Sequence, residues 1–265
     1  PLILNSGRVR DQWHTMTRTG YVPRLMQHIA EPQVDVSTAD AARFALQDGQ
    51  LARLSSPRGV MVARVNVSAR QRDGEVFTPM HWNNRFARQG KVNALVEGRC
   101  DPHSGQPESK QTAVRIMPWQ PGWQGELYAR ALPDLPAFAH WWRKATAGVE
   151  RLTLASDKAL SEVILRHCSA KGWQLQIAQT GERSSILAWH NGELMLGFWE
   201  GKVQPALAHE FIVSAFQTPP SALFERHALL GGQSPGERKD PGPIICSCFG
   251  VGENTIREAI AGGCD

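Results

Sequence analysis

The sequence predicts a mainly β protein with α+β additions: a closed β barrel, then a small α/β unit, then the start of an α-helical module. Residues 1–118 show short apolar stretches separated by turn residues, without the regular strand–helix alternation of a doubly wound sheet. Residues 150–230 mix strand and helix patterns. A Gly- and Pro-rich tether at 231–243 then separates this unit from a last helical segment.

The first 118 residues contain one predicted helix among short strands. Strands are expected at residues 2–4, 34–36, 51–55, 60–67, 75–80 and 111–117. Alternating apolar and polar residues on both sides of a turn at 56–59 predict a β-hairpin there. Ser37 or Thr38 can cap a helix over 39–47, and Asp48-Gly49 ends it.

The second half of the chain carries both strand and helix signals. Residues 119–149 are expected to be a linker and a helix, the helix covering Leu135–Ala147 with its Trp and Phe side chains in a core. Within residues 150–230, strands are expected at 151–155, 173–178, 185–190 and 193–199, and helices at 158–170 and 206–216. Cys168 lies on the apolar stripe of the first of these helices, which predicts a buried structural thiol.

Charge is distributed unevenly along the 265 residues. Residues 1–118 hold 16 Lys and Arg against 10 Asp and Glu, whereas residues 119–265 hold 13 against 15. A basic first half suits an anionic ligand, either a dinucleotide or a nucleic acid, and no nucleic-acid-binding signature is present. No apolar run reaches the roughly 20 residues of a membrane span. Five irregularly spaced cysteines indicate metal chemistry in a reducing compartment, which we take to be the cytoplasm.

The polar stretch that follows the first strand has the composition of an anion-binding loop. Residues 6–20 read Ser-Gly-Arg-Val-Arg-Asp-Gln-Trp-His-Thr-Met-Thr-Arg-Thr-Gly. Glycine permits close approach of the backbone, and arginine offers planar donors to phosphate oxygens. The same composition also occurs in ordinary polar loops with surface arginines, so the residues alone leave both interpretations open.

This stretch resembles the opening segment of the C-terminal dinucleotide-binding domain of molybdopterin oxidoreductases, the assimilatory nitrate reductases in particular. The resemblance continues through residues 76–82 (Val-Phe-Thr-Pro-Met-His-Trp), residues 93–95 (Asn-Ala-Leu) and residues 101–110 (Asp-Pro-His-Ser-Gly-Gln-Pro-Glu-Ser-Lys). It implies a six-stranded double-psi-like β barrel over residues 1–118. It also implies that this barrel holds one half of a molybdenum-bis(molybdopterin guanine dinucleotide) cofactor.

The resemblance assigns roles to individual positions. The implied cofactor-binding residues are Ser6, Gly7, Arg8, Val9, Trp13, His14, Thr15, Thr17, Asn93 and Lys110. His81 and Trp82 match the family segment that approaches the active-site funnel, where His81 would donate to an oxyanion substrate. On the residues alone, His81 could equally be a packed histidine at a strand end, and Lys110 could be a solvated surface lysine.

A second resemblance lies at the C-terminus, over residues 244–265. Cys246-x-Cys248 precedes a Gly-Val-Gly turn and a helix that ends near Ala261, for which Asn254 or Thr255 would be the cap. The apolar face expected to be buried consists of Ile256, Ala259 and Ile260. This pattern is similar to the N-terminal part of a bacterioferritin-associated-ferredoxin-like [2Fe–2S] domain. Such a cluster needs four ligands, and the other two would lie beyond the chain.

Together the two resemblances imply a fragment, cut at both ends, of a cytoplasmic enzyme that reduces nitrate to nitrite for nitrogen assimilation. A [4Fe–4S] cluster would belong to the preceding part, and the fragment alone would be inactive. Electrons would come from a flavoprotein subunit or from a ferredoxin or flavodoxin; neither nucleic acid nor a membrane is expected as a partner. The alternatives are another enzyme with the same cofactor, such as a formate dehydrogenase, or a non-catalytic redox or scaffold domain.

Overall fold

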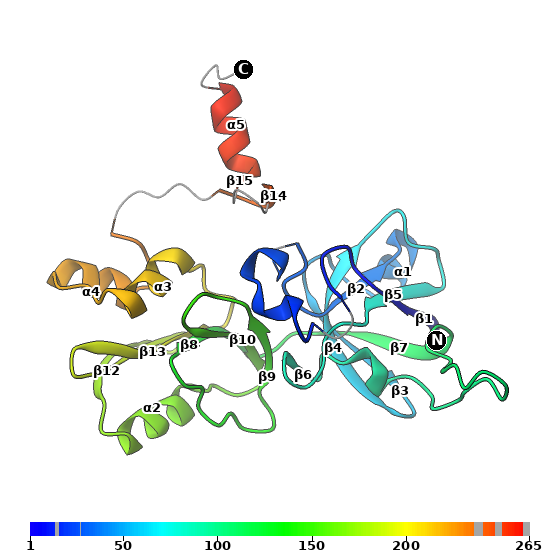
Figure 1. The fold of residues 1–265 in the computed structure, drawn as a ribbon, viewed down its shortest axis with the longest axis horizontal. Helices are drawn as coiled ribbons and strands as arrows, with labels where there is room; N and C mark the ends of the chain where they lie inside the picture. The colour runs from blue at the N-terminus through cyan, green and yellow to red at the C-terminus, as the bar shows by residue number, and fades with distance from the viewer. Residues whose placement is uncertain (14–15, 27, 236–240, 247–250, 262–265) are drawn as a thin grey trace.

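The computed structural model describes residues 1–13, 16–26, 28–235, 241–246 and 251–261. Figure 1 shows two lobes side by side, with a short C-terminal hairpin and helix beyond them. The first lobe is a closed six-stranded barrel. The second is built on a seven-stranded sheet. Mainly β architecture with few helices is therefore confirmed.

The barrel strands follow one another in an order that differs from their order in the sequence. They are β1 (Leu2–Gly7), β2 (Gln33–Val36), β3 (Leu51–Ser56), β4 (Gly59–Val67), β5 (Glu75–Pro79) and β7 (Thr112–Trp119). Around the barrel they run β1-β5-β2-β4-β3-β7. β1 pairs with β5 in parallel, and β2 pairs with β4 in parallel, whereas the other neighbours are antiparallel. The predicted hairpin is thus β3 and β4, joined by a two-residue turn.

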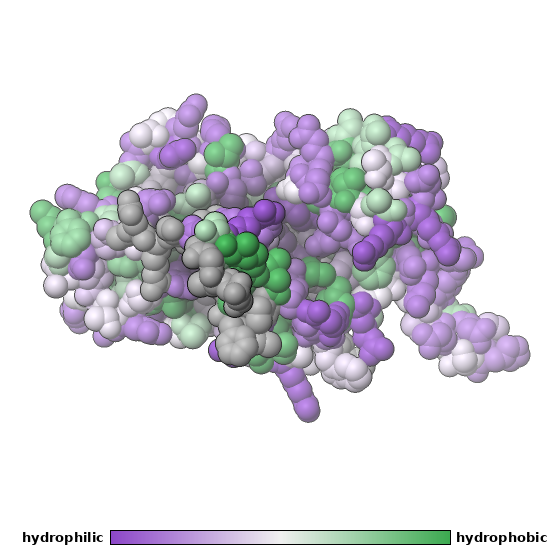
Figure 2. Space-filling view, turned by 90° about the horizontal axis from the view of Figure 1, so that it is seen from above, coloured by the Kyte–Doolittle hydropathy of each residue, from purple (hydrophilic) through white to green (hydrophobic). Residues whose placement is uncertain are grey.

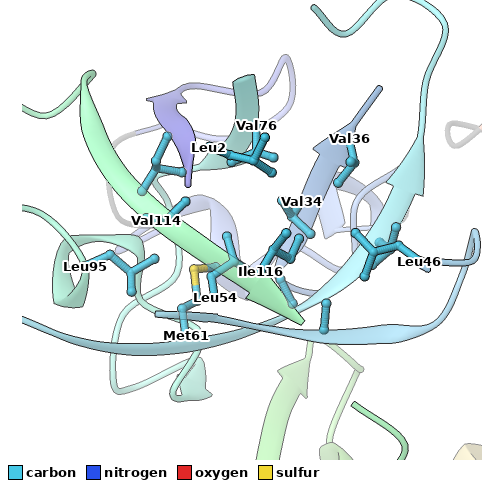
Figure 3. Close-up of a cluster of buried hydrophobic side chains, with 14 of the residues drawn as sticks. Leu2, Val34, Val36, Leu46, Leu54, Met61, Val76, Leu95, Val114 and Ile116 are labelled. Atoms are coloured by element: carbon cyan, nitrogen blue, oxygen red, sulfur yellow. The ribbon is translucent and has the colours of Figure 1, made fainter. Parts of the chain in front are cut away.

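Alternation along these strands fills the barrel with apolar side chains (Figure 3). In β7, Thr112, Val114 and Ile116 point inward, while Ala113 and Arg115 between them are exposed. Leu4 of β1 and Leu54 of β3 are fully buried in the same cluster. Since neighbouring residues of a strand face opposite sides of the wall, one face of each strand forms the core.

The barrel helix α1 (Thr38–Arg43) is anchored at its N-terminus. Ser37 is its N-cap, and the Ser37 hydroxyl accepts a hydrogen bond from the Asp40 N–H at 3.1 Å. The buried Asp40 carboxylate in turn accepts the Gly74 N–H at 2.6 Å, which links the helix to the turn before β5. The helix ends four residues earlier than predicted, because Phe44 leaves helical geometry and Ala45 takes a left-handed conformation with φ of 52°.

We expect Ser37→Ala to lower the free energy of unfolding by about 1 kcal/mol, since an orphan helix donor loses its acceptor. Ser37→Asn is the matched control, because asparagine also caps helices well and should retain most of the stability. Urea unfolding of the two variants measures the difference. Equal losses in both would show that the hydroxyl does not act as a cap.

The second sheet contains the strands that follow the barrel. They are β8 (Trp123–Ala129), β9 (His140–Lys144), β10 (Glu150–Ser156), β11 (Gln174–Gln179), β12 (Arg183–His190) and β13 (Glu193–Gly201), joined by β6 (Ala87–Arg88) from the barrel half. Their order is β11-β12-β13-β8-β10-β9-β6. The linker and helix predicted for 119–149 are therefore wrong. The aromatic spacing there resembles a helix, but β9 pairs with β10 and β6, and strand alternation buries Trp142.

Three helices accompany this sheet: α2 (Ser161–Ala170), α3 (His209–Gln217) and α4 (Leu223–Leu230). Cys168 on α2 is fully buried among apolar side chains, and burial raises the pKa of its thiol to about 11, as expected of a structural cysteine. α4 was not predicted. Its Leu223 and Phe224 are more than 60% exposed, so the segment lacks the buried apolar stripe by which helices are recognised.

A shared apolar cluster joins the barrel to the sheet. Trp82 and Phe86 from the barrel half pack with Trp142 of β9 and Ala155 of β10. All four side chains are at most 2% exposed. The backbone pairing of β6 with β9 continues this contact. The two lobes are therefore in direct contact through one shared apolar cluster, in addition to the separate core of each lobe.

The C-terminal piece consists of β14 (Ile244–Cys246), β15 (Val251–Gly252) and α5 (Glu253–Ala261). β14 and β15 pair antiparallel, and α5 follows at once. The helix begins at Glu253, so Asn254 and Thr255 lie inside it and the predicted capping is wrong. The predicted buried face is also wrong: no residue of α5 is buried, and Ile260 is 68% exposed.

Candidate functional site

One end of the barrel gathers the segments that the sequence singled out. β1 ends at Gly7 beside Pro79, the last residue of the parallel strand β5. Because β7 is antiparallel to β1, residue 112 and the segment before it lie at the same end. The turn between β3 and β4, at 56–59, also lies there, since β3 is antiparallel to β7. Loops far apart in sequence thus surround one barrel mouth.

Ser6 and Gly7 form the inner edge of this mouth. The buried Ser6 hydroxyl donates to the Ser109 carbonyl at 2.8 Å, which holds the segment before β7 against the end of β1. A Cβ at Gly7 would lie 3.0 Å from the Phe77 ring, so a side chain there would displace its neighbour. Thr78, opposite Ser6, is fully buried, and its hydroxyl has no hydrogen-bond partner among the described residues.

Arg8 and Trp13 form an exposed pair above that edge. The Arg8 guanidinium lies 5.2 Å from the centre of the Trp13 ring, and the Trp13 side chain is 57% exposed. Arg8 has no carboxylate partner among the described residues, so its donors face solvent. A cation stacked on an aromatic ring is held in place while its edge remains free for an anion.

His81 lies behind the loop rather than on its surface. It is fully buried, and its Nε2 accepts the Val9 N–H at 3.0 Å, which fixes the loop from below. Nε2 must be unprotonated to accept this bond. Trp82 is also buried, in the cluster between the lobes, and its indole N–H has no partner among the described residues. The substrate roles of both residues stay predictions.

Asn93 and Lys110 lie at the same barrel end and are exposed. Asn93 is in the single turn Val92–Ala94, which packs over the β3–β4 turn: the Ser56 hydroxyl donates to the Leu95 carbonyl at 2.7 Å. Lys110 directly follows Ser109, the residue bonded to Ser6. Thr17 is exposed in the loop, while His14 and Thr15 lie outside the described residues.

The structure adds a buried brace that the sequence did not indicate. The Gln12 side chain is 5% exposed; its amide donates to the Leu25 carbonyl at 2.9 Å, and its oxygen accepts the Thr19 hydroxyl at 2.6 Å. Outside this brace, Asp11 contacts both Arg10 and His28, and the hydrogen bond from Arg10 lowers the pKa of the Asp11 carboxyl. A polar glutamine in a polar loop gives no sequence signal of burial.

Of the two predicted cluster ligands, Cys246 lies within the described residues. Cys246 ends β14, and its backbone pairs with Val251 just before α5. Cys248 lies outside the described residues. Among the described residues no group of three or more His, Cys, Asp and Glu side chains could hold a metal ion.

Comparison with known proteins supplies the family. Residues 2–113, which comprise the barrel almost to its last strand, match the molydopterin dinucleotide binding domain. A nitrate reductase from Klebsiella oxytoca is 56% identical over 264 residues, which is 100% of this chain and 30% of that protein. The chain belongs to the molybdopterin oxidoreductase family. It spans less than a third of the length of that relative.

Other relatives match a shorter part of the chain. The assimilatory nitrate reductase catalytic subunit of Bacillus subtilis is 33% identical over 118 residues, 44% of this chain and 16% of that protein. The F420-dependent formate dehydrogenase subunit alpha of Methanocaldococcus jannaschii is 30% identical over 116 residues, also 44% of this chain and 16% of that protein. The Klebsiella match covers the whole chain and so includes the second sheet and the C-terminal piece.

Hydrophilic residues cover most of the face that Figure 2 shows, and hydrophobic residues form only small groups. No helix in the described part of the chain is both long and apolar enough to cross a membrane.

The second sheet of this molybdopterin oxidoreductase chain contains a buried polar cluster. The Glu126 carboxylate accepts the Arg151 Nε–H at 2.9 Å and the Thr153 hydroxyl at 2.9 Å. His209 lies 3.0 Å from the Arg151 Nη2 and 2.5 Å from the Tyr128 hydroxyl. Because a guanidinium only donates, the His209 Nε2 accepts, and its Nδ1–H donates to Tyr128. Burial and the Arg151 charge lower the pKa of His209 to about 4.

This cluster predicts a loss of stability in weak acid. A histidine that is neutral when folded contributes stability above its unfolded pKa near 6.5, and that contribution is lost as the pH falls through its folded pKa. We expect His209→Gln to reduce the loss of unfolding free energy between pH 7 and pH 4.5, measured by urea unfolding. His190→Gln, at an exposed histidine, is the control. Identical pH dependence in wild type and His209→Gln would contradict the prediction.

Proposed function

We propose that this chain is part of an assimilatory nitrate reductase that reduces nitrate to nitrite. The observation that carries the proposal is the 56% identity to the Klebsiella oxytoca nitrate reductase along the whole chain, including the parts outside the dinucleotide-binding domain. The relative is named only as a nitrate reductase, so the assimilatory role rests on the resemblance of the C-terminal Cys-x-Cys segment and on the Bacillus subtilis relative.

The barrel mouth fits one guanine dinucleotide of a molybdenum-bis(molybdopterin guanine dinucleotide) cofactor. Gly7 and the segment before β7 meet at the rim of this mouth, where Arg8, Asn93 and Lys110 are exposed. Arg8 and Lys110 would donate to diphosphate oxygens, while Asn93 would bond a ring edge. The cofactor, when bound, supplies the molybdenum that accepts an oxygen atom from the substrate. The chain's own residues bind and orient it.

His81 acts in this proposal as a positioning residue as well as a candidate for the substrate funnel. Its neutral Nε2 holds the Val9 N–H, so the loop that carries Arg8 stays at the mouth. Gln12 fixes the other end of the same loop through Thr19 and Leu25. A loop held at both ends loses little conformational freedom when the dinucleotide binds, which favours affinity.

The C-terminal piece would provide half of a [2Fe–2S] site through Cys246 and Cys248. Its electrons would come from a flavoprotein subunit or from a ferredoxin or flavodoxin, and a [4Fe–4S] cluster in the preceding part would carry them further. A reduced thiolate pair suits the cytoplasm, which is the location we propose. Ile245 of β14 and Ile260 of α5 are exposed, and the rest of that module would cover them.

A second candidate is a formate dehydrogenase with the same cofactor, favoured by the match to the Methanocaldococcus jannaschii protein. That match covers 44% of the chain, whereas the match to the Klebsiella oxytoca nitrate reductase covers all of it. A non-catalytic scaffold is the remaining alternative.

The test uses the full-length protein, expressed with molybdenum. Nitrite formed from nitrate with reduced viologen is measured together with the bound guanine dinucleotide, and formate oxidation is assayed in parallel. We expect nitrite formation and bound dinucleotide. Dinucleotide with formate oxidation but no nitrite would move the assignment to the formate dehydrogenase. Neither activity nor dinucleotide would leave the scaffold interpretation.

A further inference from the structure

The polar stretch at the end of β1, residues 6–20, is supported by one other segment, residues 81–88. We call the first the cofactor loop and the second the shelf; residues 14 and 15 of the loop lie outside the described residues. At the start of the shelf, the buried His81 ring accepts the Val9 N–H at 3.0 Å. The shelf therefore holds the first part of the cofactor loop by its backbone.

The other end of the cofactor loop packs closely against the same shelf. A Cβ placed on Gly20 would lie 2.7 Å from the Phe86 ring, so the loop backbone is in contact with that ring. Met16, fully buried, belongs to the apolar cluster that contains Trp82 and Phe86. Tyr21, just beyond the loop, meets the Phe86 ring edge to face, with ring centres 6.3 Å apart. Both ends of the loop are thus supported by residues of the shelf.

The shelf, in turn, is joined to the second sheet. Its last two residues are β6, in which Ala87 is paired with Trp142 of β9. The Arg143 N–H, also from β9, donates to the Phe86 carbonyl at 2.8 Å. The buried Trp142 side chain lies in the same apolar cluster as the Phe86 ring. β9 therefore sets the position of Phe86 and, through it, the far end of the cofactor loop.

Arg88 fastens this junction with its side chain. Its half-buried guanidinium donates to the carbonyl oxygens of Leu135, Pro136 and Ala139, in the segment that leads into β9. The distances to the Leu135 and Ala139 oxygens are 3.3 Å. Buried carbonyls need donors, and one planar guanidinium can serve several of them. One side chain of the shelf thereby holds both β6 and the chain that enters β9.

We propose that Arg88 is a positioning residue for cofactor binding, because it locks the shelf to the second sheet and so keeps the cofactor loop in its binding geometry. The inference rests on the proposed function only in that the barrel mouth holds a guanine dinucleotide; it does not depend on the substrate. It also gives the second sheet a role in that function. A loop that is ordered before binding loses less conformational freedom when the ligand arrives.

The test compares Arg88→Met with wild type in the full-length protein. Methionine keeps much of the aliphatic stem but donates no hydrogen bond. We expect faster hydrogen exchange in the apoprotein over residues 16–22, where the N–H groups of Gly20, Tyr21 and Val22 are hydrogen-bonded within the segment. The dissociation constant for the guanine dinucleotide should rise about 3- to 10-fold. Saturation with the dinucleotide should return the exchange to the wild-type rate, since the bound ligand orders the loop.

Arg226→Met is the matched control. The Arg226 guanidinium also donates to a carbonyl, that of Pro220 at 2.9 Å, and it covers the Trp189 ring at 5.2 Å. It belongs to α4, at the end of the second lobe away from the barrel (Figure 1). We expect wild-type exchange at 16–22 and wild-type cofactor affinity in this variant. Arg88→Lys is a second variant that retains donors, so both effects should be smaller than in Arg88→Met.

Unchanged exchange at 16–22 or unchanged cofactor affinity in Arg88→Met would overturn the inference. So would equal changes in Arg226→Met, because both variants would then reflect a general loss of stability. If Arg88→Met does not fold, Arg88→Lys is judged by the same two measurements. A full-length wild type that binds no guanine dinucleotide would instead overturn the proposed function, so the two failures are distinguishable.

Discussion

Arg8→Ala in the full-length protein should raise the dissociation constant for the guanine dinucleotide about 10- to 100-fold, since one charge-assisted hydrogen bond contributes about 1.5–3 kcal/mol. Arg8 is exposed, stacked on Trp13 and without a carboxylate partner among the described residues, so its donors are available to a diphosphate. Apoprotein is incubated with graded concentrations of cofactor, and bound guanine nucleotide is measured after gel filtration.

Arg8→Lys separates charge from geometry. Lysine keeps the positive charge but neither the planar donors nor the stacking on Trp13, so we expect an intermediate loss. Arg115→Ala, at an outward-facing position of β7, should bind normally. Because Arg8 is exposed, thermal unfolding of both alanine variants should match wild type. Unchanged cofactor binding in Arg8→Ala would mean that residues 6–13 are an ordinary polar loop.

Glu126→Ala should lower the free energy of unfolding by about 3–5 kcal/mol, the cost of leaving a buried cation without its partner. Arg151 would remain 13% exposed, with Lys144 beside it and no carboxylate between them. Urea unfolding at pH 7 measures the loss. Glu193→Ala is the control: its pairing with Arg130 is largely exposed, at 3.6 Å, so we expect less than about 1 kcal/mol.

The same carboxylate predicts a pH effect of definite sign. Burial alone would raise the pKa of Glu126, but Arg151 and Lys144 outweigh it and hold this pKa below its ordinary value of 4.5. A lowered pKa stabilises the fold above pH 4.5, and the stabilisation is lost as the pH falls further toward the folded pKa. The difference in unfolding free energy between wild type and Glu126→Ala should therefore shrink as the pH falls below 4.5. A constant difference from pH 7 to pH 3 would contradict the assignment.

The barrel was predictable because local signals and global fold agree. The Ser37 cap, the two-residue turn of the hairpin and the turn at Gly74, whose φ is 80°, each appear in the sequence where the structure has them. The segment at 123–144 was not predictable in this way. Its Trp and Phe spacing fits a helix, and its strand form depends on pairing with β10 and β6, which are distant contacts.

The residues of the candidate site were likewise predictable only in part. Ser6, Gly7 and Arg8 were recognisable from residue type in one short loop, and the structure places Lys110 next to them through Ser109. The brace at Gln12 and the cluster around Glu126 were not recognisable. Each depends on burial that no single stretch of sequence encodes, because the partners of Gln12 and Glu126 come from separate elements.

The pairing of the first strand has a consequence for synthesis of the chain. β1 pairs with β5 and β7, and β7 ends at Trp119. The barrel therefore cannot close until residue 119 has left the ribosome exit tunnel. The second sheet, in contrast, contains consecutive hairpin partners such as β11, β12 and β13, which can form as they emerge. An unclosed barrel exposes the apolar face of β1 throughout that interval. We therefore expect nascent chains that end before residue 112 to bind chaperones and to be sensitive to protease.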